Sequence, residues 1–229
     1  MRKAILVFDM DGVLVDVTES YRETIAATVE HYTGSRITPE LIQDFKNQGG
    51  WNDDWRLSHH LITGTGFDVP FDDMKAHFQQ LFLGNDLDGA GGLIQREKWV
   101  AREGVLESLA QRFRFACFTG RPRAEVKITL DRFAPGLTFD PIVAMEDVKN
   151  HKPSPDGLMQ IARDNPDSKL FYIGDSIDDA LSARAAHIPF IGIAAPSNPR
   201  YVDLAFLFQQ ERAYAIVDDI NYLNEVFPA

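Results

Sequence analysis

The stretch AILVFDMDG, residues 4–12, is the part of the sequence around which the rest of the chain is organised. Its five leading apolar residues predict a short strand that is buried on both faces, as the strands of parallel sheets are. The strand ends in two carboxylates, Asp9 and Asp11, with one residue between them. Ligands of open α/β sheets bind beyond the carboxyl ends of the strands, so the pair stands where a site is expected. Taken alone the pair is also typical of a polar loop, but two acids this close repel each other unless a cation or a shared proton relieves them.

Composition excludes several classes of protein. The 229 residues carry a net charge of −11, which disfavours a general binder of nucleic acid or anionic membrane, because both need basic surfaces. No apolar run approaches the roughly 18 residues of a membrane-spanning helix, and we expect no signal peptide. Cys117 is the single cysteine, so an internal disulfide is impossible and a reducing, cytoplasmic compartment is expected.

Residues 16–92 show apolar positions at helical spacing and no convincing strand, which predicts an all-helical insert. Helices are expected at residues 17–32, from 39 onward, at 55–62 and at 71–82. The glycine-rich run at 89–92 closes the insert and is equally typical of a hinge and of a plain loop.

From residue 93 onward, helices and short strands alternate. Strands are expected at 113–118, 142–145, 170–173, 190–193 and 214–217. Helices are expected at 104–112, at 123–133, after Pro155 and from Ile220. A further helix is expected to follow residues 174–179 and to end at about residue 186. Such alternation predicts a parallel sheet with helices on both faces. The fold class is therefore α/β, with a Rossmann-like parallel sheet core formed by residues 1–15 and 93–229 and an inserted all-helical cap domain formed by residues 16–92.

Polar side chains follow several of the predicted strands. They are Asp9 with Asp11, Thr119, Lys152, and Asp175 with Asp179. Because the carboxyl ends of parallel strands lie on one edge of the sheet, these groups can converge. The set lacks the base of a serine triad and the His or Cys spacing of a zinc site. It suits phosphoryl transfer with a hard cation, which prefers oxygen ligands.

The chain resembles the haloacid dehalogenase-like hydrolase superfamily, in the branch whose helical cap is inserted after the first strand. Four signatures occur in the family's order, and each is weak alone. They are DMDGV at 9–13, FTGR at 118–121, KP at 152–153 and GDSIDD at 174–179. Together they are specific, and the resemblance covers nearly the whole chain.

The resemblance implies a role for each core residue. Asp9 would be the nucleophile that attacks phosphorus and becomes an aspartyl phosphate. Asp11 would be the general acid and base. Thr119, helped by nearby backbone N–H groups such as that of Gly120, would bind the phosphoryl oxygens, and Lys152 would neutralise charge on them and on Asp9.

The resemblance also implies Mg²⁺ as the cofactor. Its ligands would be Asp9, the backbone carbonyl of Asp11, and Asp175. Asp179 lies four residues after Asp175, on the same face of the helix start, and would support the metal or Lys152.

These features predict a Mg²⁺-dependent phosphatase that hydrolyses a small phosphomonoester. Dehalogenating members lack a carboxylate two residues after the nucleophile, and this chain keeps Asp11. Phosphomutases related to β-phosphoglucomutase share every core motif and stay open. A phosphonate hydrolase needs a cap lysine that forms an imine, and Lys46 keeps that alternative open. A non-catalytic binding or regulatory role is disfavoured because no catalytic position has been lost.

Substrate choice is assigned to the cap, in the segment of residues 48–55. Trp51 or Trp55 could stack on a ring, while Asn52 and Asp53 could hydrogen-bond hydroxyls. Equally, both tryptophans could fill the core of the cap. Acids in this segment favour a sugar or polyol monophosphate over a highly anionic leaving group. We expect a small phosphorylated metabolite as the partner, no nucleic acid and no membrane, and the oligomeric state stays open.

Overall fold

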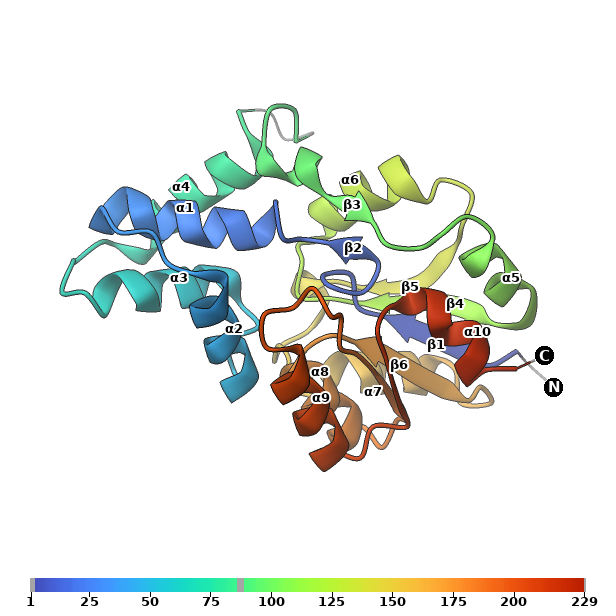
Figure 1. The fold of residues 1–229 in the computed structure, drawn as a ribbon. Coiled ribbons are helices and arrows are strands. Elements are labelled where there is room, and N and C mark those ends of the chain that lie inside the picture. The colour runs from blue at the N-terminus through green and yellow to red at the C-terminus, as the bar shows by residue number, and fades with distance from the viewer. Residues whose placement is uncertain (1–2, 86–88, 229) are drawn as a thin grey trace. The chain divides into compact units, whose positions relative to one another are not determined.

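A computed structural model describes residues 3–85 and 89–228 (Figure 1). The chain separates into two compact units, which we call the core unit, Met1–Val15 with Trp99–Ala229, and the helical unit, Asp16–Lys98. Residues 93–98, which the sequence prediction placed with the core, lie in the helical unit in this division. Across the described residues, the helices are too short or too polar to cross a membrane.

The core unit is built on a parallel sheet in the order β5-β4-β1-β6-β7-β8. Its strands are β1 Ile5–Phe8, β4 Arg114–Phe118, β5 Phe139–Val143, β6 Leu170–Gly174, β7 Phe190–Ile193 and β8 Ala215–Val217. Strand β1 is central, and in register Val7 faces Ala116 of β4 and Tyr172 of β6. All residues of β1 are buried, as the sequence predicted, and the α/β fold class is confirmed.

Helices cover both faces of this sheet. They are α5 Val105–Arg112, α6 Arg123–Phe133, α7 Asp156–Asp164, α8 Ile177–Ala185, α9 Tyr201–Gln210 and α10 Leu223–Val226. Ile5 and Val7 of β1 share one buried cluster with residues of α7, α8 and α9, which lie on one side of the sheet in Figure 1. Phe8 points to the opposite face, where its ring lies 5.2 Å from that of Phe115 and 6.0 Å from that of Phe139.

Strand β5 and helix α9 correct the sequence prediction. The strand runs from Phe139 to Val143, whereas residues 142–145 were predicted. The prediction began too late because Pro141 is untypical of a strand. Proline is tolerated here because β5 is the edge of the sheet. Helix α9 was not predicted at all.

The reason lies in the apolar pattern of α9. Leu204 and Phe208, four residues apart, are buried, but Val202 and Phe206 are 62% and 57% exposed. Apolar residues on both faces hide the single stripe that identifies an amphipathic helix. The closing helix also differs in its start, because a short 3₁₀ turn, Ile220–Tyr222, precedes α10.

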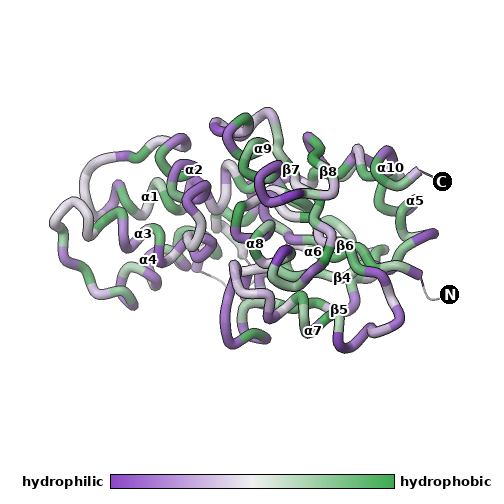
Figure 2. The backbone as a smooth tube through the Cα atoms, turned by 90° about the horizontal axis from the view of Figure 1, so that it is seen from below, coloured by the Kyte–Doolittle hydropathy of each residue, from purple (hydrophilic) through white to green (hydrophobic). Residues whose placement is uncertain are grey.

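Within the described residues, the α-helices of the helical unit are α1 Tyr21–Thr33, α2 Pro39–Gln48, α3 Asp54–Thr63 and α4 Phe71–Leu83. Helices α1, α3 and α4 pack against one another, and the rings of Tyr21 and Phe82 lie 4.0 Å apart. Hydrophobic and hydrophilic stretches alternate along these helices in Figure 2, as expected of amphipathic helices. Where the chain passes between the units, β2 Val15–Asp16 pairs with β3 Lys98–Trp99.

Candidate active site

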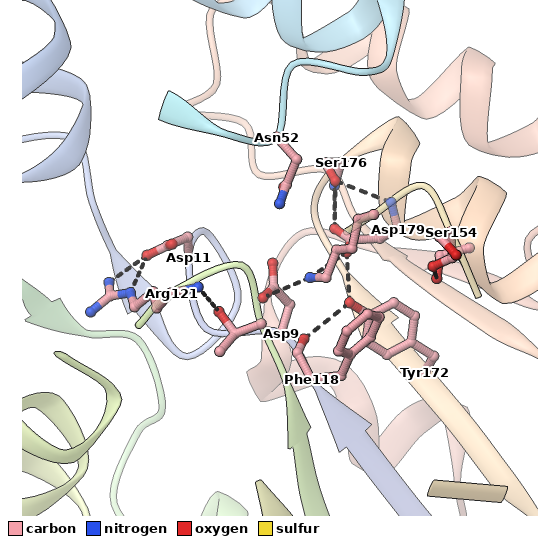
Figure 3. A network of polar contacts seen from close by, with 12 residues as sticks. Asp9, Asp11, Asn52, Phe118, Arg121, Ser154, Tyr172, Ser176 and Asp179 are labelled. Atoms are coloured by element: carbon pink, nitrogen blue, oxygen red, sulfur yellow. Dashed lines mark hydrogen bonds and ion pairs between the residues drawn. The ribbon is translucent and has the colours of Figure 1, made fainter. Parts of the chain in front are cut away.

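Polar side chains meet at the carboxyl ends of neighbouring strands in the core unit (Figure 3). Asp9 follows β1, Thr119 follows β4 and Asp175 follows β6, and β1 lies between the other two strands. Gly12 lets the loop after β1 pass the end of β6. Its φ is +69°, and a Cβ atom there would lie 1.9 Å from Oδ2 of Asp175. The sheet order therefore brings together groups that are far apart in the sequence.

A buried ion-pair network occupies this edge of the sheet. Nζ of Lys152 lies 3.0 Å from Oδ1 of Asp9 and 2.8 Å from Oδ1 of Asp179. The three residues are only 6%, 4% and 0% exposed, respectively. One ammonium thus serves two buried carboxylates, so the network carries an excess of negative charge.

Both carboxylate oxygens of Asp179 are occupied. Oδ1 accepts a hydrogen bond from the hydroxyl of Tyr172 at 2.6 Å in addition to its contact with Lys152. Oδ2 accepts from the backbone N–H of Ser176 at 3.1 Å and from its hydroxyl at 2.6 Å. Ser176 in turn caps α8 by accepting the backbone N–H of Asp179. Asp179 is therefore better placed to hold Lys152 than to bind a metal directly. Tyr172 was not predicted as part of the site, although a tyrosine in a buried strand signals a required hydrogen-bond partner.

The ionisation of this network is uneven. Burial raises the pKa of Asp9 to about 7, with Lys152 opposing the shift and Asp179 adding to it. Burial also acts to raise the pKa of Asp179, but Lys152 and the hydrogen bonds to this carboxylate outweigh it and lower that pKa. For Lys152, burial favours the neutral amine, but Asp179 and Asp9 outweigh it and raise the pKa. Asp9 is consequently the carboxylate that an added cation would stabilise most.

Three carboxylates at this edge of the sheet could hold a metal ion. Asp9, Asp175 and Asp179 each offer one oxygen, and these oxygens lie within 4.8 Å of one another. An all-oxygen set of acids fits a hard cation such as Mg²⁺. Because the oxygens of Asp179 are already bonded, Asp9 and Asp175 are the better candidates for direct ligands. The side chain of Asp11 is outside this set.

The side chain of Asp11 is held by Arg121 instead. Nε of Arg121 donates to Oδ1 of Asp11 at 2.8 Å, and Nη2 donates to the same oxygen. The Arg121 side chain is 1% exposed, and its Nη1 donates to Oγ1 of Thr129 at 2.9 Å. Figure 3 shows Asp11 directed toward Arg121. Arg121 belongs to the FTGR signature, but no role was predicted for it from the sequence, although an arginine at a buried strand end requires an acidic partner.

Thr119 is also buried, with 1% of its surface exposed. Its Oγ1 accepts the backbone N–H of Arg121 at 3.3 Å. This bond uses the hydroxyl oxygen as an acceptor, so the hydroxyl proton is available to an oxygen of a ligand. Gly120 lies between the two residues in the turn after β4.

The predicted cap tryptophans belong to the helical unit, where their surroundings differ. Trp51 is half-buried, and its ring lies 4.5 Å from that of His60 and 5.5 Å from that of Phe45. Trp55 is 8% exposed on α3, and Nζ of Lys75 lies 3.8 Å from its ring centroid. Trp55 therefore contributes to the interior of its unit, whereas Trp51 keeps an accessible surface.

The carboxylate of Asp53 serves its own helix. It accepts the backbone N–H groups of Trp55 at 3.0 Å and Arg56 at 3.1 Å, which caps α3. The carboxylate thus has a structural role at the start of α3, and its contact with a substrate hydroxyl stays a prediction. Asn52, one residue earlier, is half-buried and its backbone oxygen accepts from Lys46 at 3.4 Å.

Lys46 forms an ion pair with Asp54, and their side chains are 9% and 15% exposed. Lys46 therefore has a structural partner within its own unit. An imine on this lysine, as a phosphonate hydrolase would need, stays an alternative.

Comparisons with known proteins agree with this geometry. The family model described as haloacid dehalogenase-like hydrolase matches residues 3–187. The phosphoglycolate phosphatase of Pseudomonas fluorescens is 25% identical over 205 residues, which cover 85% of this chain and 70% of that protein. The imidazoleglycerol-phosphate dehydratase of Phytophthora nicotianae is 31% identical over 203 residues, or 84% of this chain. This chain spans only 44% of the length of the latter relative.

Among solved structures, a phosphatase from Thermococcus thioreducens is 26% identical, with a TM-score of 0.65. The likeness covers 91% of this chain and 99% of that chain. The family model matches most of the sequence, and the four signatures meet at one edge of the sheet. The chain therefore belongs to the haloacid dehalogenase-like hydrolases.

Proposed function

We propose that this protein is a Mg²⁺-dependent phosphatase that hydrolyses a small phosphomonoester through an aspartyl phosphate on Asp9. One observation carries the proposal: two acids at a single strand end have different cationic partners. Lys152 lies 3.0 Å from Asp9, and Arg121 holds Asp11. The two carboxylates are thereby separated into a buried candidate nucleophile and a more exposed candidate acid–base group.

In the first step, an Asp9 carboxylate oxygen attacks phosphorus, and the bond from phosphorus to the leaving oxygen breaks. The leaving oxygen takes a proton from the carboxyl group of Asp11, which becomes a carboxylate. Lys152 and the hydroxyl of Thr119 offset the charge that develops on the phosphoryl oxygens. The products are an alcohol and the aspartyl phosphate.

In the second step, a water oxygen attacks the same phosphorus, and the bond from phosphorus to Asp9 breaks. The Asp11 carboxylate takes a proton from this water, so both aspartates return to their starting forms. The product is inorganic phosphate. Splitting the displacement in this way replaces one difficult step by two easier ones.

Asp9, Asp175 and the backbone carbonyl of Asp11 are proposed to hold Mg²⁺. When bound, the ion supplies positive charge that favours ionised Asp9 and offsets the charge of the phosphoryl group. Asp179, with both oxygens bonded, is proposed to keep Lys152 in position from outside the ligand shell.

The substrate is proposed to be a small phosphorylated metabolite in a reducing, cytoplasmic compartment. The free buried thiol of Cys117 supports that compartment. Trp51 and Asn52 remain the proposed substrate contacts of the helical unit. The names of the relatives add phosphoglycolate and imidazole-bearing phosphomonoesters to the sugar and polyol phosphates that should be screened.

The test is phosphate release from this screen with Mg²⁺ and with excess chelator, together with the Asp11→Asn variant. A nitrophenolate leaves without needing a proton, so this variant should release about one nitrophenolate per active site and then stall, because general acid–base help is typically worth about 10²–10⁴-fold. Mass spectrometry after acid quenching should find the phosphate on Asp9. Full activity in chelator would refute the metal, and wild-type turnover of an alkyl phosphate by Asp11→Asn would refute the role of Asp11.

The core motifs are shared by phosphomutases of the β-phosphoglucomutase type, so the fate of the phosphoenzyme separates the two activities. A phosphatase discharges the aspartyl phosphate onto water. Discharge onto a sugar hydroxyl, followed as transfer of labelled phosphate from the enzyme, would assign the mutase instead.

A further inference from the structure

We propose that Arg121 is a positioning residue that fixes Asp11 through one carboxylate oxygen and leaves the other oxygen to carry the transferred proton. This inference rests on the proposed function of Asp11 as the acid–base group. It assigns Arg121 as the residue that orients Asp11, and Oδ2 of Asp11 as the oxygen that gives and takes the proton.

The geometry of the contact is selective. Nε and Nη2 of Arg121 both donate to Oδ1 of Asp11, so two N–H groups point at one oxygen. A proton placed on Oδ1 would face these two donors, and therefore any proton that the carboxyl group holds belongs on Oδ2. Within the described part of the chain, the hydrogen bonds and ion pairs of the Asp11 side chain all involve Oδ1.

Arg121 is itself anchored. Its side chain is 1% exposed, against 31% for that of Asp11, so the guanidinium is the fixed end of the pair and the carboxylate is the accessible end. Nη1 donates to Thr129 on α6, which lies eight residues further along the chain. The rigid fork of the guanidinium then fixes the position of Oδ1 with two N–H groups, a geometry that a lysine ammonium does not offer.

The cation that holds Asp11 differs in kind from the cation that contacts Asp9. The carboxyl group that must give and take a proton is held by a delocalised cation that keeps its own protons, because arginine does not deprotonate in proteins. The nucleophile instead contacts the ammonium of Lys152. Arg121 can therefore orient Asp11 without competing for the proton that is transferred.

The first test is Arg121→Lys, which keeps the charge and removes the two-pronged contact. On an alkyl phosphate we expect kcat to fall by about tenfold to a hundredfold, with KM within about twofold, because proton transfer is misaligned rather than absent. The nitrophenolate burst, which needs no proton, should stay within about threefold of wild type in rate. Equal losses on the alkyl substrate and in the aryl burst would overturn the proposal.

A double-mutant cycle provides a readout that a purely structural role would not produce. In the Asp11→Asn background, Arg121→Lys should cost less than about threefold further, since its target is already disabled. A full additive loss would overturn the proposal. If Asp11→Asn alone retains wild-type turnover of alkyl phosphates, the acid–base role fails. If Asp11→Asn is impaired while Arg121→Lys is not, the positioning role fails alone.

Arg123→Lys is the matched control, because this side chain is 51% exposed and pairs with Asp147. It should leave both substrates unaffected. If Arg121→Lys does not fold, as circular dichroism would show, Thr129→Val tests the same anchor with little change in volume. The same selective loss on alkyl phosphates is expected, at about threefold to tenfold, and an unselective loss or no loss would overturn the proposal.

Discussion

Each unit contains a lysine that pairs with an aspartate, and the two pairs differ in charge balance. In the helical unit, Lys46 pairs with Asp54, one cation for one anion. In the core unit, Lys152 is shared between Asp9 and Asp179. The first pair is neutral as a whole, whereas the second is short of positive charge, and the pKa of Asp9 is raised to about 7. An unbalanced buried cluster is the expected property of a site that receives a cation, and a balanced one is typical of structural stabilisation.

The two pairs also arise differently from the sequence. Lys46 and Asp54 are eight residues apart, on consecutive helices of one unit. Asp9 and Lys152 are brought together by the order of the strands. The local pair therefore follows from its own segment of chain, while the pair at the candidate site exists only if the whole sheet forms.

Replacing the nucleophile should have the largest effect. Asp9→Asn should reduce turnover by on the order of 10⁴-fold or more, because loss of a covalent nucleophile leaves only binding and electrostatic terms. Its counterpart in the balanced pair, Asp54→Asn, should lower the melting temperature and retain turnover. Phosphate release and thermal melts of both variants test this contrast, with mass spectrometry to exclude deamidation back to Asp9. Comparable activity losses in the two variants would remove the distinction.

The two lysine substitutions should also differ in their effect on kcat, by a smaller factor than the two aspartate substitutions. Lys152→Met should lower kcat by about 10²–10³-fold, because one fixed electrostatic donor to the phosphoryl group is lost. Lys46→Met should change kcat far less and should not abolish activity, since the proposed chemistry does not use this amine. Steady-state kinetics on one phosphomonoester would decide. A Lys46→Met protein as inactive as Lys152→Met would favour a catalytic role for Lys46.

Substitution of the two tryptophans should separate an effect on stability from an effect on substrate preference. Trp55→Ala should destabilise the protein by about 3–5 kcal/mol, as expected when a large buried aromatic side chain is truncated. Trp51→Ala should melt near the wild-type temperature and alter the ranking of substrates in the phosphomonoester screen. Melting curves and the screen should be run on both variants. If Trp51→Ala unfolds and leaves the ranking unchanged among molecules that remain folded, its proposed substrate contact is wrong.

The smallest effect should be on the pH dependence of the melting temperature when no metal is bound. The pKa of Asp9 is about 7 in the folded protein, against its ordinary value of 3.8. Between these two values the folded protein holds a proton that the unfolded chain releases, so this group makes the free energy of unfolding fall as pH rises through that window. The melting temperature of Asp9→Asn relative to wild type should therefore increase from pH 4.5 to pH 8 in chelator. A difference that stays constant with pH would contradict the raised pKa, and Asp54→Asn serves as the control.

Much of the core unit could be predicted from sequence because its signals are local. The apolar run before Asp9 is long enough to form a buried strand, and helix α6 was predicted with the bounds that the structure has, Arg123–Phe133. Helix α9 was missed because Val202 and Phe206 remain exposed and obscure its buried stripe. In the helical unit, the N-cap role of Asp53 was not recognised, because an acid before a helix reads equally well as a cap and as a ligand.

That Asp9 and Asp11 end a buried strand of an α/β sheet could be inferred from the sequence alone, because burial of an apolar run and alternation of elements are properties of short segments. The sequence also identified Thr119, Lys152 and Asp175 as polar groups at or near other strand ends. The cationic partner of each carboxylate became clear only from the folded structure. Arg121 and Asp11 are 110 residues apart, and their contact depends on β1 and β4 being neighbours, which local spacing does not encode. Pairing between distant strand ends is set by the packing of the whole sheet, and so are the partners of each carboxylate at the site.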